Sequence, residues 1–159
     1  MYLAYHPRRE EWNDREELGT DSDSEMVLGY IQRKFPNAKD ILDLGMCNGG
    51  LIKRLRELGK NAIGIDLRIK AREGLVVADA RQLPFKNESI DFVTEIMLLA
   101  DLDEFQSLPL TELERIILEA KRVLRKRGIF ITSPYADLSK KYFDKTIFND
   151  HGVWGVYQK

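Results

Sequence analysis

Short apolar runs alternate with amphipathic helical patterns from Lys39 to about residue 132. This alternation is typical of βαβ units, in which a helix connects two parallel strands, so it restricts the chain to a sheet covered by helices. The expected strands are residues 41–44, 62–66, 75–79, 90–96 and 128–132. We therefore predict an α/β fold with a doubly wound sheet of five parallel strands.

One helix is expected before the first strand. Ser22 and Glu25 have the spacing of a capping box, in which each side chain bonds a backbone N–H of the first turn. Pro36 ends the helix after Phe35, because proline disfavours helical backbone in the residue before it. The expected apolar face consists of Met26, Val27, Tyr30 and Ile31.

Two further helices connect the strands. The buried face of the first is expected to hold Leu51, Ile52, Leu55 and Leu58. This helix is expected to end at Gly59. The second helix is longer: it begins at a capping box of Thr111 and Glu114 and ends at Gly128. Only residues 67–74 separate the second and third strands, so we expect that crossover to be trimmed to a turn or two.

The last part of the chain fits a short helix over residues 137–143 and an antiparallel hairpin. The hairpin strands are residues 145–148 and 153–158, and its turn is residues 149–152, which are rich in turn-forming side chains. An antiparallel pair at the edge of a parallel sheet is common in doubly wound folds. The predicted sheet therefore has five parallel strands plus a C-terminal antiparallel hairpin.

Length and composition indicate one domain of 159 residues, at roughly 150 residues per domain. Within it we expect an N-terminal cap or arm (1–25), a ligand-binding core (26–134) and the helix with its hairpin (135–159). One cysteine and two histidines argue against a metal site. No apolar run approaches the roughly 18 residues of a membrane span, so a cytoplasmic protein without membrane partners is expected. The net charge of −1 does not indicate nucleic-acid binding.

Carboxylates recur where successive strands are expected to end, which is the edge where open α/β sheets bind ligands. The first strand leads through Asp43 into the glycine turn GMCNGG, and the next strands reach Asp66, Asp79 and Glu95. Each carboxylate alone is better explained as a solvated strand end or a helix cap. Their repetition at neighbouring strand ends predicts a binding site.

The spacing within this set indicates an adenosine-containing ligand. Asp66 lies 21 residues after Gly45, close to the roughly 20-residue offset at which an acidic side chain meets a ribose diol. A dinucleotide-binding loop would need a glycine at the position of Cys47, because any side chain there obstructs the pyrophosphate. Asp43 also adds negative charge beside the site that the pyrophosphate would occupy. A cationic ligand suits these carboxylates better, and S-adenosylmethionine carries both a sulfonium and an ammonium group.

From about Ile41 to Pro134 the chain resembles the class I S-adenosylmethionine-dependent methyltransferases. ILDLGMCNGG resembles the first motif of that family, with Cys47 in place of its central glycine. AIGIDL resembles the second motif, VVADARQLPFKNESIDFV the third with the following strand, and EAKRVLRKRGIFIT the segment that ends in the fifth strand. The resemblance implies a Rossmann-like sheet, S-adenosylmethionine as cofactor and S-adenosylhomocysteine as product.

The resemblance also implies roles for individual residues. Asp43 and Gly45 would hold the methionine moiety, and Asp66 would bind both ribose hydroxyls. Asp79 would accept from the adenine amino group while the Ala80 amide faces a ring nitrogen. Side chains flanking the adenine and ribose would be Leu67 and either Ile96 or Met97. The full expected cofactor-binding set is Asp43, Gly45, Met46, Cys47, Asn48, Gly49, Asp66, Leu67, Asp79, Ala80, Glu95, Ile96 and Met97.

The expected activity is methyl transfer to an unidentified acceptor by in-line displacement. Positioning can supply most of the rate of such a reaction, so no dedicated catalytic residue is required, and none is assigned. One alternative is a non-catalytic module that binds S-adenosylmethionine or a partner. Another is an NAD-dependent oxidoreductase, which Cys47 and the absence of a second substrate domain disfavour. Because no insertion long enough to cover the site is visible, a macromolecular acceptor or a pocket completed by a partner is expected.

Overall fold

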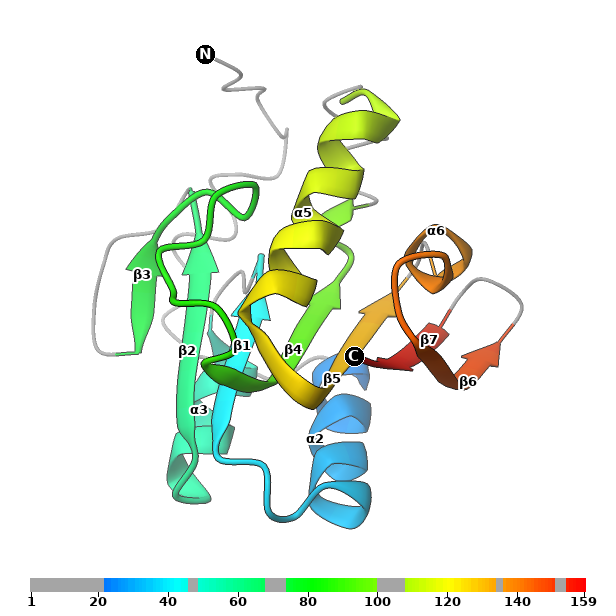
Figure 1. Ribbon diagram of the computed structural model, residues 1–159. Coiled ribbons are helices and arrows are strands. Elements are labelled where there is room, and N and C mark those ends of the chain that lie inside the picture. Colours follow the sequence, from blue (N-terminus) through cyan, green and yellow to red (C-terminus); the bar gives the residue numbers. More distant parts are fainter. Residues whose placement is uncertain (1–21, 46–48, 68–73, 100–107, 134–135, 151–153) are drawn as a thin grey trace.

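The computed structural model describes residues 22–45, 49–67, 74–99, 108–133, 136–150 and 154–159 (Figure 1). The helices among these residues are α2 (Ser22–Lys34), α3 (Gly50–Glu57), α5 (Leu110–Val123) and α6 (Ala136–Lys140). The strands are β1 (Asp40–Leu44), β2 (Asn61–Asp66), β3 (Leu75–Val77), β4 (Ile90–Ile96), β5 (Leu124–Ser133), β6 (Lys145–Asp150) and β7 (Trp154–Gln158).

All of these strands form one sheet in the order β3-β2-β1-β4-β5-β7-β6. The pairs from β3 to β5 are parallel, whereas β7 runs antiparallel to β5 and β6 antiparallel to β7. Leu44 near the centre pairs with Ile65 of β2 on one side and with Glu95 of β4 on the other. The predicted sheet of five parallel strands with a C-terminal antiparallel hairpin is confirmed.

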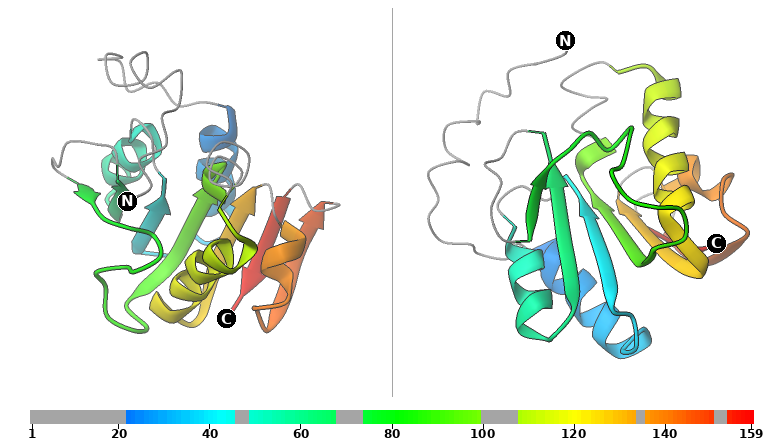
Figure 2. Two further views of the ribbon diagram at one scale, coloured as in Figure 1. Left: turned by 90° about the horizontal axis from the view of Figure 1, so that it is seen from above. Right: turned by 60° about the vertical axis from the view of Figure 1, so that its left-hand side comes forward.

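Helices cover both faces of this sheet, with α2 and α3 on one side and α5 on the other (Figure 2). Each face of the sheet has its own hydrophobic core, and the side chains of β1 alternate between these two cores. Ile41 packs with the side chains of α2 and α3, whereas Leu42 and Leu44 pack with those of α5. Burial on both faces explains why the strands read as continuous apolar runs in the sequence.

The first two helices differ from the prediction at one side chain each. In α2, Val27 and Ile31 are buried as expected, but Met26 is 45% exposed. Leu58 is 46% exposed at the C-cap position of α3, one residue beyond the helix. The predicted end at Gly59 is correct, since this glycine follows the helix with a left-handed φ of 73°.

The predicted start of the longest helix is wrong in detail. Pro109 is the N-cap residue of α5, and no side-chain hydrogen bond caps this end. Instead of capping the helix, the Glu114 carboxylate pairs with the Lys141 ammonium at 2.5 Å. The tertiary partner has therefore replaced the local capping box expected for Thr111 and Glu114.

The predicted helix end at Gly128 is also wrong, because β5 begins directly after α5 at Leu124. Leu124 pairs with Ile90, and a register shift follows along the β4–β5 ladder. Gly128 lies inside β5, where an added Cβ would come within 2.9 Å of the Arg125 carbonyl oxygen. This glycine serves a close backbone approach rather than a helix end.

The C-terminal hairpin packs through an aromatic stack. The rings of Phe130 and Phe143 lie 5.0 Å apart, and those of Phe143 and Tyr157 lie 5.7 Å apart. The short helix is confirmed but ends earlier than predicted, at Lys140, and β6 extends to Asp150. The first half of the predicted turn 149–152 is thus strand, and residues 151–153 lie outside the described residues.

Candidate functional site

The turn after β1 lies beside the end of β2. Gly45 has a left-handed φ of 72°, and its N–H donates to the Ile65 carbonyl oxygen over 2.9 Å. A Cβ at this position would lie 2.8 Å from the Cβ of Leu98, so both the backbone angle and the packing require glycine. The structure therefore brings Gly45, the first residue of the predicted glycine turn, next to Asp66, the last residue of β2.

A second glycine starts α3. Gly49 is the N-cap with a φ of 77°, and a Cβ there would meet the Leu75 side chain at 3.0 Å. The other residues of the predicted glycine turn, Met46, Cys47 and Asn48, lie outside the described residues.

Two of the predicted carboxylates are partly exposed at this edge. Asp66 is half-buried and pairs in register with Val77 of β3. Strand β3 ends two residues earlier than predicted, so Asp79 lies in the segment beyond it, with its side chain 33% exposed. Leu67 is 54% exposed, whereas Ala80 is buried.

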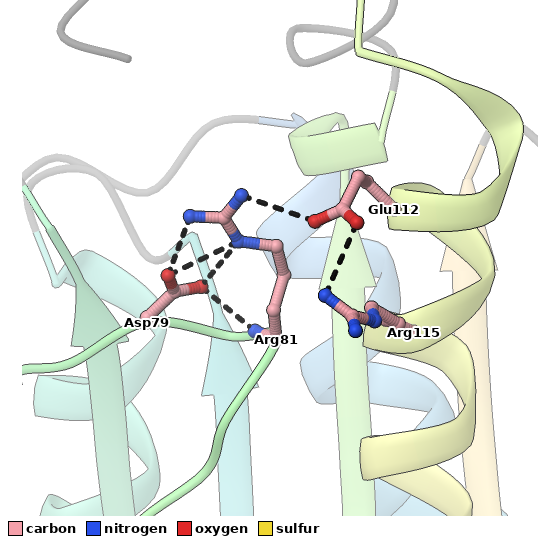
Figure 3. Close-up of polar contacts among 4 residues, drawn as sticks. All are labelled: Asp79, Arg81, Glu112 and Arg115. Carbon is pink, nitrogen blue, oxygen red and sulfur yellow. Dashed lines mark hydrogen bonds and ion pairs between the residues drawn. The ribbon is translucent and has the colours of Figure 1, made fainter. Parts of the chain in front are cut away.

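Asp79 is held in a chain of alternating charges (Figure 3). Arg81 binds its carboxylate with a shortest distance of 2.6 Å, and the other end of the guanidinium reaches Glu112 of α5 at 3.2 Å. Arg115 in turn pairs with Glu112 at 3.1 Å. Hydrogen bonds from Arg81 hold the pKa of Asp79 below its ordinary value. Sequence reasoning missed Arg81 and Glu112, although the Asp79-x-Arg81 spacing was a local signal for the first.

The other two carboxylates are buried. Asp43 is 6% exposed and accepts a hydrogen bond of 2.6 Å from the Thr94 hydroxyl of β4. Glu95 is fully buried on the opposite face of the sheet, where the Thr132 hydroxyl and the Leu99 N–H both donate to it. Burial raises the pKa of Glu95 from 4.5 to about 8, so this side chain carries a proton at neutral pH. The structure thus separates the four predicted carboxylates into two partly exposed and two buried ones.

The end of β4 has an unusual backbone. Met97 has a φ of 66°, a left-handed angle that is uncommon for a residue other than glycine. Its N–H donates to the Ser133 carbonyl oxygen over 2.6 Å, which continues the β4–β5 ladder by one step. Ile96 is half-buried, whereas the Met97 side chain is 46% exposed at the edge where the ligand is expected.

Within the described part of the chain, no cluster of three or more His, Cys, Asp or Glu side chains could hold a metal ion. None of the described helices is long and apolar enough to cross a membrane.

A doubly wound sheet with a glycine turn and acidic strand ends at one edge defines the Rossmann-like class of α/β proteins. The model of a family described as methyltransferase domain matches residues 42–132, more than half of the chain. The chain belongs to this family, and the resemblance to class I S-adenosylmethionine-dependent methyltransferases is confirmed.

The individual relatives differ in how much of each chain they share. An uncharacterized protein of Methanocaldococcus jannaschii is 33% identical over 109 residues, which are 64% of this chain and 39% of that protein. The match therefore spans about two fifths of that relative's length.

Solved structures are similar in fold at low sequence identity. The PH0226 protein from Pyrococcus horikoshii has a TM-score of 0.63 at 19% identity, over 93% of this chain and 76% of that one. A SAM-dependent methyltransferase from Aquifex aeolicus has a TM-score of 0.55 at 16% identity, over 97% and 98% of the two chains.

Proposed function

We propose that this chain binds S-adenosylmethionine at the carboxyl edge of β1, β2 and β3 and transfers its methyl group to an acceptor. The observation that carries the proposal is the position of Asp66, which ends β2 directly beside Gly45, the residue that follows β1. Family membership supports the same reaction class over hydride transfer, the oxidoreductase alternative.

The described residues fit this cofactor. Asp66 is partly exposed, and a carboxylate can accept from both hydroxyls of a ribose diol. The buried Asp43 carboxylate lies two residues before Gly45 and places negative charge near the proposed amino-acid end of the ligand. A cationic ligand is favoured there, because opposite charges attract more strongly where water is partly excluded.

When bound, S-adenosylmethionine supplies a methyl group on a positively charged sulfur. The chain's own contribution is to bind and orient it: Asp66 accepts from the ribose hydroxyls, and Asp79 accepts from the adenine amino group. The Ala80 amide donates to a ring nitrogen of the adenine, and the exposed side chains of Leu67 and Met97 flank the adenine and the ribose. Because correct placement supplies most of the rate of such a transfer, no general base is assigned to this chain.

The decisive measurement is calorimetric titration of S-adenosylmethionine and S-adenosylhomocysteine into the wild type and into Asp66→Ala. The substitution removes hydrogen bonds to a charged acceptor, each worth about 1.5–3 kcal/mol, so even one corresponds to a loss of affinity of roughly 10- to 150-fold. Both ligands should lose a similar factor because both keep the ribose.

Glu57→Ala is the matched control, since this exposed carboxylate lies at the far end of α3 from Gly49. Its affinity for both ligands should equal that of the wild type. Unchanged affinity in a folded Asp66→Ala variant would refute the placement of the ribose.

Radiolabelled S-adenosylmethionine mixed with fractions of a cell extract then tests for transfer. Label in any fraction identifies the size class of the acceptor. Tight binding without transfer to any fraction would favour the non-catalytic module instead.

A further inference from the structure

Among the described residues, the hydrogen bonds to the Asp79 carboxylate occupy three of its acceptor sites and leave one. The Arg81 backbone N–H donates to Oδ1 over 2.8 Å, and the Arg81 Nη2 group donates to Oδ2 over 2.6 Å. Nε lies 3.0 Å from both oxygens but carries only one hydrogen. Three protons therefore meet a carboxylate that offers about four lone-pair sites, and one site remains.

The guanidinium that makes these contacts is itself fixed from its other end. Nη1 of Arg81 donates to Oε2 of Glu112 over 3.2 Å. Glu112 lies in the first turn of α5, where Arg115 holds its second oxygen at 3.1 Å. Arg81 thus connects the segment after β3 to a helix on the face of the sheet (Figure 3), and the plane of its guanidinium cannot turn freely.

We propose that Arg81 is a positioning residue for adenine recognition: together with Glu112 it fixes the Asp79 carboxylate so that its remaining acceptor site meets the adenine amino group. This inference rests on the proposed function, in which Asp79 accepts from that group. It adds the residues that set the direction of the acceptor, and it places one of them on α5.

The contacts among Asp79, Arg81 and Glu112 indicate that Arg81 orients the Asp79 carboxylate rather than stabilising the fold. The three side chains are between 25% and 33% exposed, and ion pairs with that degree of exposure contribute little to stability. What the arginine adds is a planar edge with two parallel N–H donors, which holds a carboxylate in one plane. Lysine keeps the positive charge but has no such edge, so it should not replace arginine here.

The test compares two ligands in calorimetric titrations of the full chain. One is S-adenosylhomocysteine, and the other is its analogue with hydrogen in place of the adenine amino group. In Arg81→Gln and in Arg81→Lys, we expect affinity for S-adenosylhomocysteine to fall by about tenfold, the loss of one hydrogen bond to a charged group. Affinity for the analogue should change by no more than about twofold, because it never used that acceptor.

Arg33→Gln is the matched control, since it makes the same substitution at an exposed arginine in the last turn of α2, outside the chain of ion pairs around Asp79. It should bind both ligands as the wild type does. Glu112→Ala should lower the affinity for S-adenosylhomocysteine by about threefold, a smaller loss than in Arg81→Gln, and leave the affinity for the analogue unchanged. Thermal melting of every variant confirms that it is folded.

Two results would overturn the inference. If Arg81→Gln weakened both ligands equally, the arginine would support the site without orienting Asp79, and if it weakened neither, it would have no part in binding. A wild type that binds neither ligand would overturn the proposed function as well. Wild-type binding together with an unaffected Arg81→Gln variant would overturn this inference alone.

Discussion

The buried carboxyl group of Glu95 makes the stability of this fold depend on pH. Its pKa is 4.5 in its ordinary state and about 8 in the folded protein, because burial disfavours the charged form. Between these two pH values the folded state binds one proton more than the unfolded state. The free energy of unfolding should therefore fall by about 1.4 kcal/mol for each pH unit in this window.

The sign and size follow from the direction of the shift. A raised pKa means that the contribution of Glu95 is fully present below about pH 4.5 and is lost as the pH rises through about 8. The cumulative loss is about 3 kcal/mol at pH 7 and about 5 kcal/mol well above pH 8. These values are a large part of the roughly 5–15 kcal/mol that stabilises a typical domain.

The perturbation that isolates this effect is Glu95→Gln. A glutamine has nearly the same shape, keeps an acceptor oxygen for the Leu99 N–H and can donate to the Thr132 hydroxyl oxygen. It removes the titrating group, so the stability of the variant should lie within about 1 kcal/mol of the wild type at pH 5 and exceed it by about 4 kcal/mol at pH 8.

Urea unfolding followed by circular dichroism at pH 5, 6, 7 and 8 measures the difference directly. Other titrating groups cancel when the two proteins are compared at each pH, provided that the urea dependence of the free energy is the same. Parallel pH profiles for the two proteins would refute the reasoning, because they would mean that Glu95 has the same proton affinity in both states.

Two further predictions concern stability and the acceptor. Asp91→Ala should lower the free energy of unfolding by about 1–3 kcal/mol in urea titrations. The Asp91 carboxylate accepts from the backbone N–H groups of Lys39 and Asp40 and from Arg125, and the variant loses these hydrogen bonds. An unchanged urea midpoint of unfolding would show that water replaces the carboxylate fully. In the radiolabelling assay the label should appear in macromolecular fractions, and efficient methylation of a free metabolite by the isolated protein would contradict this expectation.

The sequence by itself determined the parallel sheet and the edge at which the ligand is proposed to bind. Strands such as Ile90–Ile96 were predictable because short apolar runs and helical spacing are local properties of the chain. The positions of Gly45, Asp66 and Asp79 near strand ends followed directly from those strands. Their proposed contacts with a cofactor stay predictions.

Only the tertiary structure decided which local signals were used. Thr111 and Glu114 have the spacing of a capping box, yet Glu114 pairs with Lys141, which lies 27 residues further along the chain. Gly128 has the position of a helix end, yet β5 had already started at Leu124 because that residue pairs with Ile90 of β4. In both places a distant partner outweighed a local preference worth about 1 kcal/mol.

The same reason explains what the sequence could not say about the site. Glu95 reads like the other strand-end carboxylates, but the helix-covered face on which it lies is fixed only when β4 and β5 pair and Thr132 meets it. Glu112 lies 31 residues from Arg81, so nothing local indicates that it holds the arginine beside Asp79. The local sequence pattern determined which acidic side chains lie near strand ends. Long-range packing decided which of these side chains face solvent, which are buried and which form ion pairs.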